Sequence, residues 1–202
     1  MSTPMHTTLH TDNELTQAIA QGPVTSEYRA DLQHVIQELN RLRATELASY
    51  LQYKQHAYMA VSLLSPGLKQ DFQAHADVEL QHADRLGERI QQLGGIPLYT
   101  PSELGAKAEE EGVRPVQGAT LNDMVIENLM LERQQVTAYT ALIRKLGDSD
   151  LVTRHLLLQI LVDTEQHASE LADYLKRTAD TQRKTAETSP AATSGLSKVI
   201  GE

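Results

Sequence analysis

Five polar residues interrupt otherwise apolar helical stripes, and their types are those that bind metal ions. They are three glutamates and two histidines: Glu46, Glu79, His82, Glu132 and His167. Each occupies a position where its neighbours, three and four residues away, form the buried face of a helix. Buried carboxylates without compensating charge are costly, and no Lys or Arg occupies the same stripes at that level. A divalent ion such as iron or manganese would compensate them, because both accept carboxylate and imidazole ligands.

The simpler interpretation applies to single residues. One polar residue on such a stripe is usually a hydrogen-bonded core or boundary residue, and we interpret His75 in this way. Glu79 and His82 would also be weak evidence alone, because one helical turn separates many such pairs by chance. Five such residues at one level of four helices favour the metal site.

Four segments with helical periodicity carry these residues. We expect helices at about residues 27–64, 68–93, 121–146 and 149–175. The first ends at Ser65-Pro66-Gly67 and the second at Gly94-Gly95, and Gly147 supplies the cap of the third. Ala, Leu, Gln, Glu, Arg and Lys dominate the composition and all favour helices.

The connections between the segments predict the topology. Few residues join the first helix to the second and the third to the fourth, so each pair must form an antiparallel hairpin. The middle connection spans about 25 residues, which is enough to cross the length of a bundle. We therefore expect an all-α fold, an antiparallel four-helix bundle at residues 28–177, with a long crossover between its second and third helices.

The two termini differ in composition from the bundle. Residues 1–27 are predicted to form a flexible arm with at most one short helix near residues 14–20, and residues 178–202 a flexible tail. Residues 189–195 resemble a flexible linker, and residues 196–200 could dock on a shell or scaffold partner. An unstructured tail is the simpler alternative.

Composition excludes several classes of site. The chain has no cysteine, so it can form no disulfide, zinc–thiolate site or iron–sulfur cluster. Its start lacks the features of a signal peptide and no apolar stretch approaches about 18 residues, so a cytoplasmic protein is expected. The net charge of -9 argues against nucleic acid as a partner of the main body, and either attracts cations or serves solubility alone.

The motifs around these residues resemble those of the bacterioferritin-type di-iron proteins of the ferritin-like superfamily. Glu79-Leu80-Gln81-His82-Ala83-Asp84-Arg85, followed by Glu88-Arg89-Ile90, is similar to the second-helix signature of that family. Glu46 lies 33 residues before Glu79, as the first-helix ligand does. Leu131-Glu132 resembles the third-helix ligand and residues 160–167 the fourth-helix motif. The resemblance covers about residues 28–176 and implies a ferritin-like bundle.

The resemblance also implies roles for individual residues. One side of a site for two irons would be formed by Glu46, Glu79 and His82, and the other by Glu132 and His167. Glu79 and Glu132 would bridge the metals. Tyr53, two turns after Glu46, matches a tyrosine beside the metals that could donate an electron, and an ordinary core tyrosine is the alternative.

Two departures from the family pattern bear on the site. The fourth-helix motif has Glu where this chain has Thr164, so we expect another carboxylate to complete the second metal position. Asp163, four residues before His167, is the better candidate and Glu165 the other. Leu80 stands where haem-binding bacterioferritins have an axial Met, so no haem is expected there.

Several functions follow as hypotheses. The leading one is a ferroxidase that oxidises Fe(II) at the two-iron site with O2 or H2O2 and stores Fe(III) inside a homo-oligomeric cage. The resemblance implies 12 or 24 subunits. Residues 178–202 are too polar for a fifth helix, which favours the smaller, Dps-like cage or a non-standard assembly. A di-iron or manganese redox protein without storage is the main alternative. A DNA-protecting mini-ferritin is less favoured, because residues 176–202 hold only five basic against three acidic residues.

Overall fold

The computed structural model describes the backbone of residues 11–60, 66–116 and 118–188, and all regular secondary structure in these ranges is helical. The helices are α1 (Asp12–Gln21), α2 (Leu32–Met59), α3 (Pro66–Gln92), α4 (Pro101–Glu110), α5 (Leu121–Leu146) and α6 (Leu151–Thr188). Among the described residues, no helix combines the length and apolar character needed to cross a membrane.

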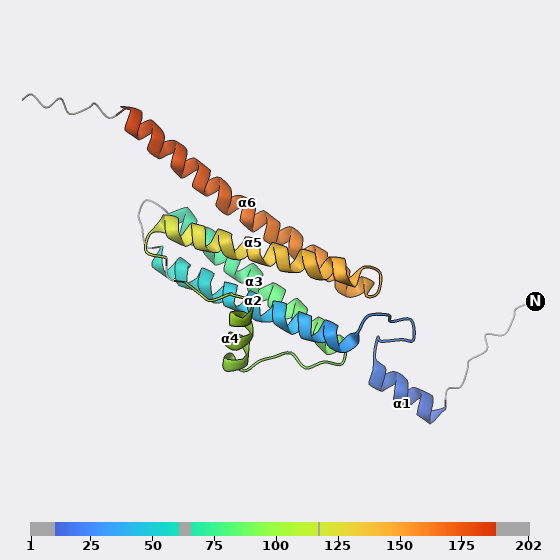
Figure 1. Ribbon diagram of the computed structural model, residues 1–202. Coiled ribbons are helices and arrows are strands. Elements are labelled where there is room, and N and C mark those ends of the chain that lie inside the picture. Colours follow the sequence, from blue (N-terminus) through green and yellow to red (C-terminus); the bar gives the residue numbers. More distant parts are fainter. Residues whose placement is uncertain (1–10, 61–65, 117, 189–202) are drawn as a thin grey trace, which may run out of the picture.

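The four long helices α2, α3, α5 and α6 lie side by side as a bundle (Figure 1). α2 packs against α3, and α5 against α6, as antiparallel hairpins. The connection from α3 returns along the bundle, so that the start of α5 packs near the end of α2. The prediction of an all-α bundle with one long crossover is confirmed.

Capping residues explain where two of the helices begin and end. α5 has the predicted bounds, because Thr120 and Asp123 cap its start reciprocally and Gly147 follows its end with a φ of 50°. α2 begins at Leu32 instead of near residue 27. Its cap is Asp31, whose side chain accepts a hydrogen bond from the backbone of His34. The short helix predicted in the N-terminal segment is α1.

α6 is longer than predicted. It continues to Thr188, although the sequence pattern indicated an end near residue 175 and a tail from residue 178. Extending an existing helix adds one hydrogen bond for each residue fixed, and this segment is rich in good helix formers despite its polarity. The predicted linker at residues 189–195 and docking peptide at residues 196–200 lie outside the described residues.

The crossover contains a helix that was not predicted, α4. It covers one side of α2 (Figure 1). Thr100 precedes it, Pro101 starts it, and the Thr100 hydroxyl donates a hydrogen bond to Glu103. Proline at the first position followed by an acidic residue in the first turn is a helix-start signal. The small cluster beneath this region contains Ala44, Ala48, Ala108, Val113 and Leu131.

Two apolar clusters fill the bundle and leave a polar layer between them. One cluster contains Leu39, Leu86, Leu142, Leu157 and Ile160. The other contains Tyr53, Ala57, Phe72, Val125 and Leu171. Along α3, Glu79 and His82 fall between Phe72 and Leu86. The polar layer is therefore held from both sides by close-packed hydrophobic residues.

Asp150 joins three parts of the chain at one end of the bundle. It caps α6 by accepting hydrogen bonds from the Thr153 backbone at 2.9 Å and the Thr153 hydroxyl at 2.6 Å. The Arg89 guanidinium of α3 lies 3.1 Å from its Oδ1, and the Tyr28 hydroxyl donates to its Oδ2 at 2.9 Å. Burial alone would raise the pKa of Asp150, but these hydrogen bonds and the charge of Arg89 lower it below its ordinary value.

Replacing Asp150 with Ala should lower the free energy of unfolding by about 3 kcal/mol, because the buried Arg89 loses its carboxylate and α6 its cap. Urea unfolding followed by circular dichroism measures this. Asp148→Ala is the matched control, because the Asp148 side chain is 93% exposed. The control should change stability by less than about 0.5 kcal/mol. If Asp150→Ala and Asp148→Ala lower the free energy of unfolding equally, Asp150 does not stabilise the bundle through Arg89 and the cap of α6.

Candidate metal centre

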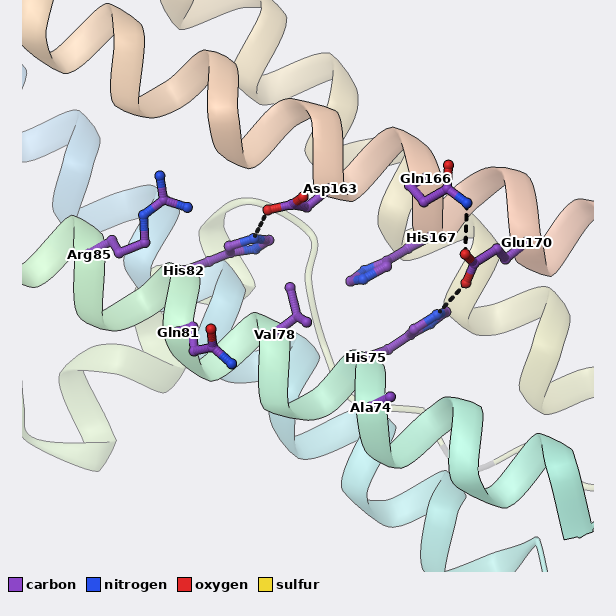
Figure 2. Close-up of a pocket in the computed structure, with 10 residues that line it drawn as sticks. All are labelled: Ala74, His75, Val78, Gln81, His82, Arg85, Asp163, Gln166, His167 and Glu170. Carbon is purple, nitrogen blue, oxygen red and sulfur yellow. Dashed lines mark hydrogen bonds and ion pairs between the residues drawn. The ribbon is translucent and has the colours of Figure 1, made fainter.

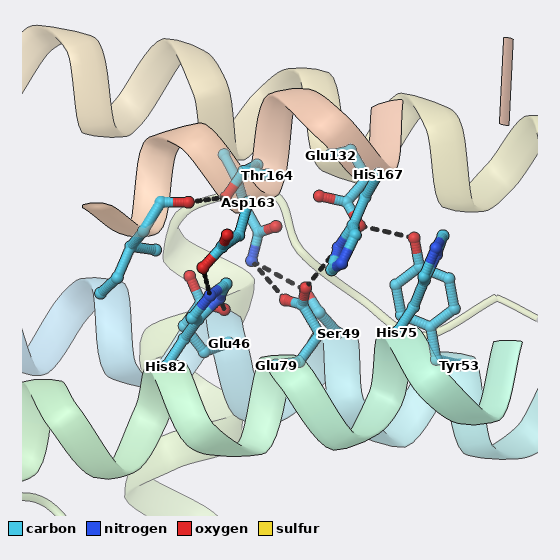
Figure 3. A network of polar contacts seen from close by, with 12 residues as sticks. Glu46, Ser49, Tyr53, His75, Glu79, His82, Glu132, Asp163, Thr164 and His167 are labelled. Atoms are coloured by element: carbon cyan, nitrogen blue, oxygen red, sulfur yellow. Dashed lines mark hydrogen bonds and ion pairs between the residues drawn. The ribbon is translucent and has the colours of Figure 1, made fainter. Parts of the chain in front are cut away.

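The five side chains expected to point inward meet in one layer of the bundle (Figure 3). Each is 6% exposed or less. All four long helices contribute to this layer: α2 supplies Glu46, α3 supplies Glu79 and His82, α5 supplies Glu132, and α6 supplies His167. Residues more than a hundred positions apart are therefore brought together by the packing of the two hairpins.

Glu46, Glu79 and His82 form a first group, in which one potential ligand atom of each lies within 4.8 Å of the others. His82 Nδ1 lies 3.4 Å from Glu46 Oε2. At the other edge of the ring, Nε2 lies 3.2 Å from Asp163 Oδ2. A proton donated from Nε2 to Asp163 leaves the Nδ1 lone pair facing Glu46, which is how metal-binding histidines are commonly oriented.

A second group contains Glu132, His167 and His75, again with ligand atoms within 4.8 Å of one another. The rings of His75 and His167 stack with centroids 4.0 Å apart and an interplanar angle of 17°. His75 Nε2 lies 2.9 Å from Glu170 Oε2. From the sequence, His75 was expected to be an ordinary core residue, although its position one turn before Glu79 on the same stripe was the available signal.

Glu79 lies between the two groups. His167 Nδ1 is 3.3 Å from Glu79 Oε1 and 3.2 Å from Glu132 Oε1. Gln135 Nε2 lies 3.4 Å from Glu79 Oε2 and donates to the Ser49 hydroxyl oxygen at 3.0 Å. Two ions, one in each group, would thus share Glu79 as a neighbour.

Two buried tyrosines hold the outer carboxylates in a crossed pattern. The Tyr53 hydroxyl of α2 donates to Glu132 Oε1 of α5 at 2.5 Å, and the Tyr139 hydroxyl of α5 donates to Glu46 of α2. Each tyrosine lies seven residues after the glutamate of its own helix. Tyr53 was expected beside the metals from the family resemblance, whereas Tyr139 was not predicted to take part in the site. The repeated seven-residue spacing would have indicated it.

α6, the fourth helix of the bundle, contributes fewer charged side chains to the layer than the resemblance led us to expect. Thr164 is buried, and its hydroxyl donates to the Ile160 carbonyl at 3.0 Å. Neither group includes Asp163, whose side chain is 48% exposed, and Glu165 is exposed. A ligand role for Asp163 or Glu165 therefore stays a prediction, and the structure instead places Asp163 against the outer nitrogen of His82.

Burial strongly disfavours the charged forms of the carboxylates. It raises the pKa of Glu46 to about 7, that of Glu79 to about 8 with a further contribution from Glu46, and that of Glu132 to about 7 with a further contribution from Glu79. Burial opposes a charged His167, but its hydrogen bond to Glu132 and its close contact with the Glu79 carboxylate raise its pKa to about 10. Without a metal ion, the layer thus retains protons at neutral pH.

His75 and the two tyrosines behave differently. Burial lowers the pKa of His75 most, and the charge of His167 lowers it further, despite the opposing effect of Glu170. The imidazole is therefore neutral at neutral pH, as a metal ligand must be. Burial and neighbouring carboxylates raise the pKa of Tyr53 and of Tyr139 well above the ordinary value, so both phenols stay protonated and donate their hydrogen bonds.

Several ligand-type atoms of the layer have no hydrogen bond within the described part of the chain. They are Glu46 Oε2, Glu79 Oε1, His82 Nδ1, Glu132 Oε2 and His75 Nδ1. Buried polar atoms of native proteins nearly always have a partner, so their concentration in one layer requires an explanation. Carboxylate oxygens and imidazole nitrogens are suitable ligands for iron or manganese, and the residues present therefore fit such ions.

A pocket of about 300 Å³ reaches the layer from outside, between α3 and α6 (Figure 2). His82 and His167 form its floor with His75, and the carboxylates of Asp163 and Glu170 lie at its sides. The outer edges of these imidazoles can thus be reached without opening the bundle.

Comparisons with known proteins agree with this architecture. Residues 36–181 match the family model of the ferritin-like domain. The chain is 31% identical over 145 residues to the "Nutrient stress-induced DNA-binding protein" of a Synechococcus species, covering 70% of this chain and 80% of that protein. It is 26% identical over 168 residues to the "Bacterioferritin" of Desulfovibrio desulfuricans, covering 81% and 88%.

A solved structure shares the fold. It is described as a dodecameric thioferritin, a bacterioferritin-related protein from Bacteroides fragilis. Its TM-score is 0.73 at 23% identity, and the match covers 85% of this chain and 98% of that one. Since the family model matches most of the sequence and the bundle places the expected residues in one layer, this chain belongs to the ferritin-like family.

Proposed function

We propose that this protein is a ferroxidase that binds two Fe(II) ions as substrate in the buried layer and stores the Fe(III) product. The observation that carries this proposal is the pair of adjacent glutamate–histidine groups, in which several buried ligand atoms have no hydrogen bond within the described residues. Family membership supports an iron-related function, and the pocket between α3 and α6 supplies a path for ions.

The chemistry needs no nucleophile from the protein. Each Fe(II) loses one electron. If O2 is the oxidant, it takes up two electrons and two protons and leaves as H2O2. If H2O2 is the oxidant, two electrons and two protons convert it to two water molecules. The buried carboxylates stabilise the added positive charge of the ferric ions in a medium of low dielectric constant. Tyr53 orients Glu132, and its role as an electron donor stays a prediction.

A redox protein that uses two irons or manganese without storage is the alternative. Its basis is Thr164, which leaves the layer with three carboxylates where four would balance two divalent ions. The ligand types suit either metal. Mineral growth beyond the two bound ions separates storage from this alternative.

Storage requires a hollow assembly, and we propose that the protein forms a homo-oligomeric cage. The structural relative from Bacteroides fragilis is described as dodecameric, which supports the smaller of the two expected sizes. The cytoplasmic location, the shell or scaffold partner and the absence of haem stay predictions. Leu80, where an axial Met would stand, is 37% exposed on α3.

Anaerobic loading with Fe(II) should show two tightly bound ions per chain, and oxidant should then produce a ferric absorbance followed by mineral growth at high loading.

Glu79→Gln should weaken Fe(II) binding by about 10-fold to 100-fold, because it removes the carboxylate between the groups. Glu88→Gln is the matched control, since Glu88 is exposed on the same helix. Unchanged binding in Glu79→Gln, or mineral growth without prior binding, would refute the proposal.

The metal-free protein should lose stability as pH rises from about 5 to about 8. The folded-state pKa values of Glu46, Glu79 and Glu132 exceed the ordinary 4.5, so the folded protein binds more protons than the unfolded chain in this range. The raised pKa of His167 acts in the same direction. Thermal unfolding of chelator-treated protein at both pH values measures this.

The same experiment repeated with Co(II) supplies the control. Metal ions replace the protons, so Co(II) should raise the unfolding temperature more at the higher pH than at the lower. In Glu79→Gln, which cannot ionise at this position, the pH dependence of the metal-free protein should be smaller. A metal-free protein that is equally stable at both pH values would show that the carboxylates are not buried as described.

DNA protection is a second candidate, because one relative is named as a DNA-binding protein. The exposed end of α6 extends past the other helices (Figure 1) and carries Lys176, Arg177, Arg183 and Lys184. Because the chain has a net charge of -9, we expect any DNA complex to dissociate as salt rises to about 150 mM. A gel shift over a salt series tests this, and binding that persists at the higher salt would favour the DNA-protecting function.

A further inference from the structure

The two hairpins repeat the same pattern with one interruption. Glu46 and Tyr53 of α2 correspond in spacing to Glu132 and Tyr139 of α5. Glu79 and His82 of α3, three residues apart, correspond to Thr164 and His167 of α6. Position 164 thus breaks the repeat, and it does so where a carboxylate would have served the metals.

His75 is the second departure from the repeat. It lies four residues before Glu79, and the matching residue of α6, four before Thr164, is Ile160. The extra imidazole therefore occurs in one hairpin alone, on the side of the layer that contains Glu132 and His167. Thr164 lies three residues before His167 on α6, and His75 stacks on the His167 ring, so the missing carboxylate and the extra imidazole both neighbour His167.

The surroundings of His75 prepare it to bind a cation. Its side chain is 7% exposed and stacks on His167, and the Tyr53 ring meets it edge-on with centroids 5.2 Å apart. Glu170 accepts the Nε2 proton at 2.9 Å, which leaves a lone pair on Nδ1. Within the described residues, this Nδ1 is buried and has no hydrogen bond.

We propose that His75 is a ligand of the second metal position, where it takes the place of the carboxylate that Thr164 cannot supply. This inference rests on the proposed function. It makes the two positions unequal, because the first has Glu46, Glu79 and His82 and the second has one glutamate and two histidines. Oxygen-preferring Mn(II) should then fill the first position, whereas Co(II), which also accepts imidazole readily, should fill both.

Calorimetric titration of the full-length protein with Co(II) tests the proposal without any redox turnover. The wild type should show two binding steps per chain. His75→Ala should weaken the second step about 10-fold or more and leave the first unchanged. His75→Gln should have the same effect, although its amide can still donate to Glu170. His155→Ala removes an exposed histidine of α6 and should match the wild type. Adding Thr164→Glu to His75→Ala should restore the second step.

The outcomes separate this inference from the proposed function. If the titrations of His75→Ala and His75→Gln coincide with that of the wild type, His75 is not a ligand, while a metal site that is lost in Glu79→Gln would still stand. If the wild type binds no Co(II), or if Glu79→Gln binds Co(II) as well as the wild type does, the layer holds no metal and both proposals fail. Two equal Mn(II) steps in the wild type would also overturn the inequality of the positions.

Discussion

Three carboxylates are buried in the middle of an apolar bundle, and the surrounding fold has to compensate for the cost of this burial. Glu46, Glu79 and Glu132 are almost completely inaccessible to solvent. The protein offers them two tyrosine hydroxyls, a glutamine amide and three imidazoles, but no lysine or arginine of the described layer pairs with them. This partial compensation raises their pKa values and leaves ligand atoms free, which is unfavourable for a purely structural core and suitable for one that takes up cations.

The surrounding fold supports this layer. Hydrophobic clusters on both sides keep the helices close, so the three buried carboxylates cannot separate to reach water. Asp150 and Arg89 join α3 to α6 at one end of the bundle, and the crossed tyrosines join α2 to α5 inside it. A preorganised set of ligands loses little entropy when the metal binds. The unfavourable electrostatics of the metal-free layer are offset by packing elsewhere in the molecule.

Much of the fold and of the site could be predicted from the sequence because both depend on local periodicity. The stripes identified Glu46, Glu79, His82, Glu132 and His167, and the structure brings these residues together. Helix ends with strong signals, such as Thr120 and Gly147, were also predictable. α4 was not predicted, because the crossover contains several prolines and glycines, which usually interrupt helices. The end of α6 was predicted too early, because polar composition alone does not terminate a helix.

The rest of the site depends on contacts between helices, which no single stripe reveals. His75 has the appearance of a lone core histidine until α6 places His167 and Glu170 against it. Asp163 has a suitable spacing from His167, but the rotation of α6 directs it to the outer edge of His82. Spacing along one helix indicates which residues share a face. It does not show which atoms across the interface they meet.

Anomalous X-ray diffraction at the iron absorption edge, from crystals loaded with Fe(II) without oxygen, shows directly whether the buried layer binds iron. The proposed metal site predicts two peaks about 3.5–4 Å apart inside the bundle. One should lie among Glu46, Glu79 and His82, and the other beside Glu132 and His167. Iron bound only at the surface, with no peak in the buried layer, would contradict it.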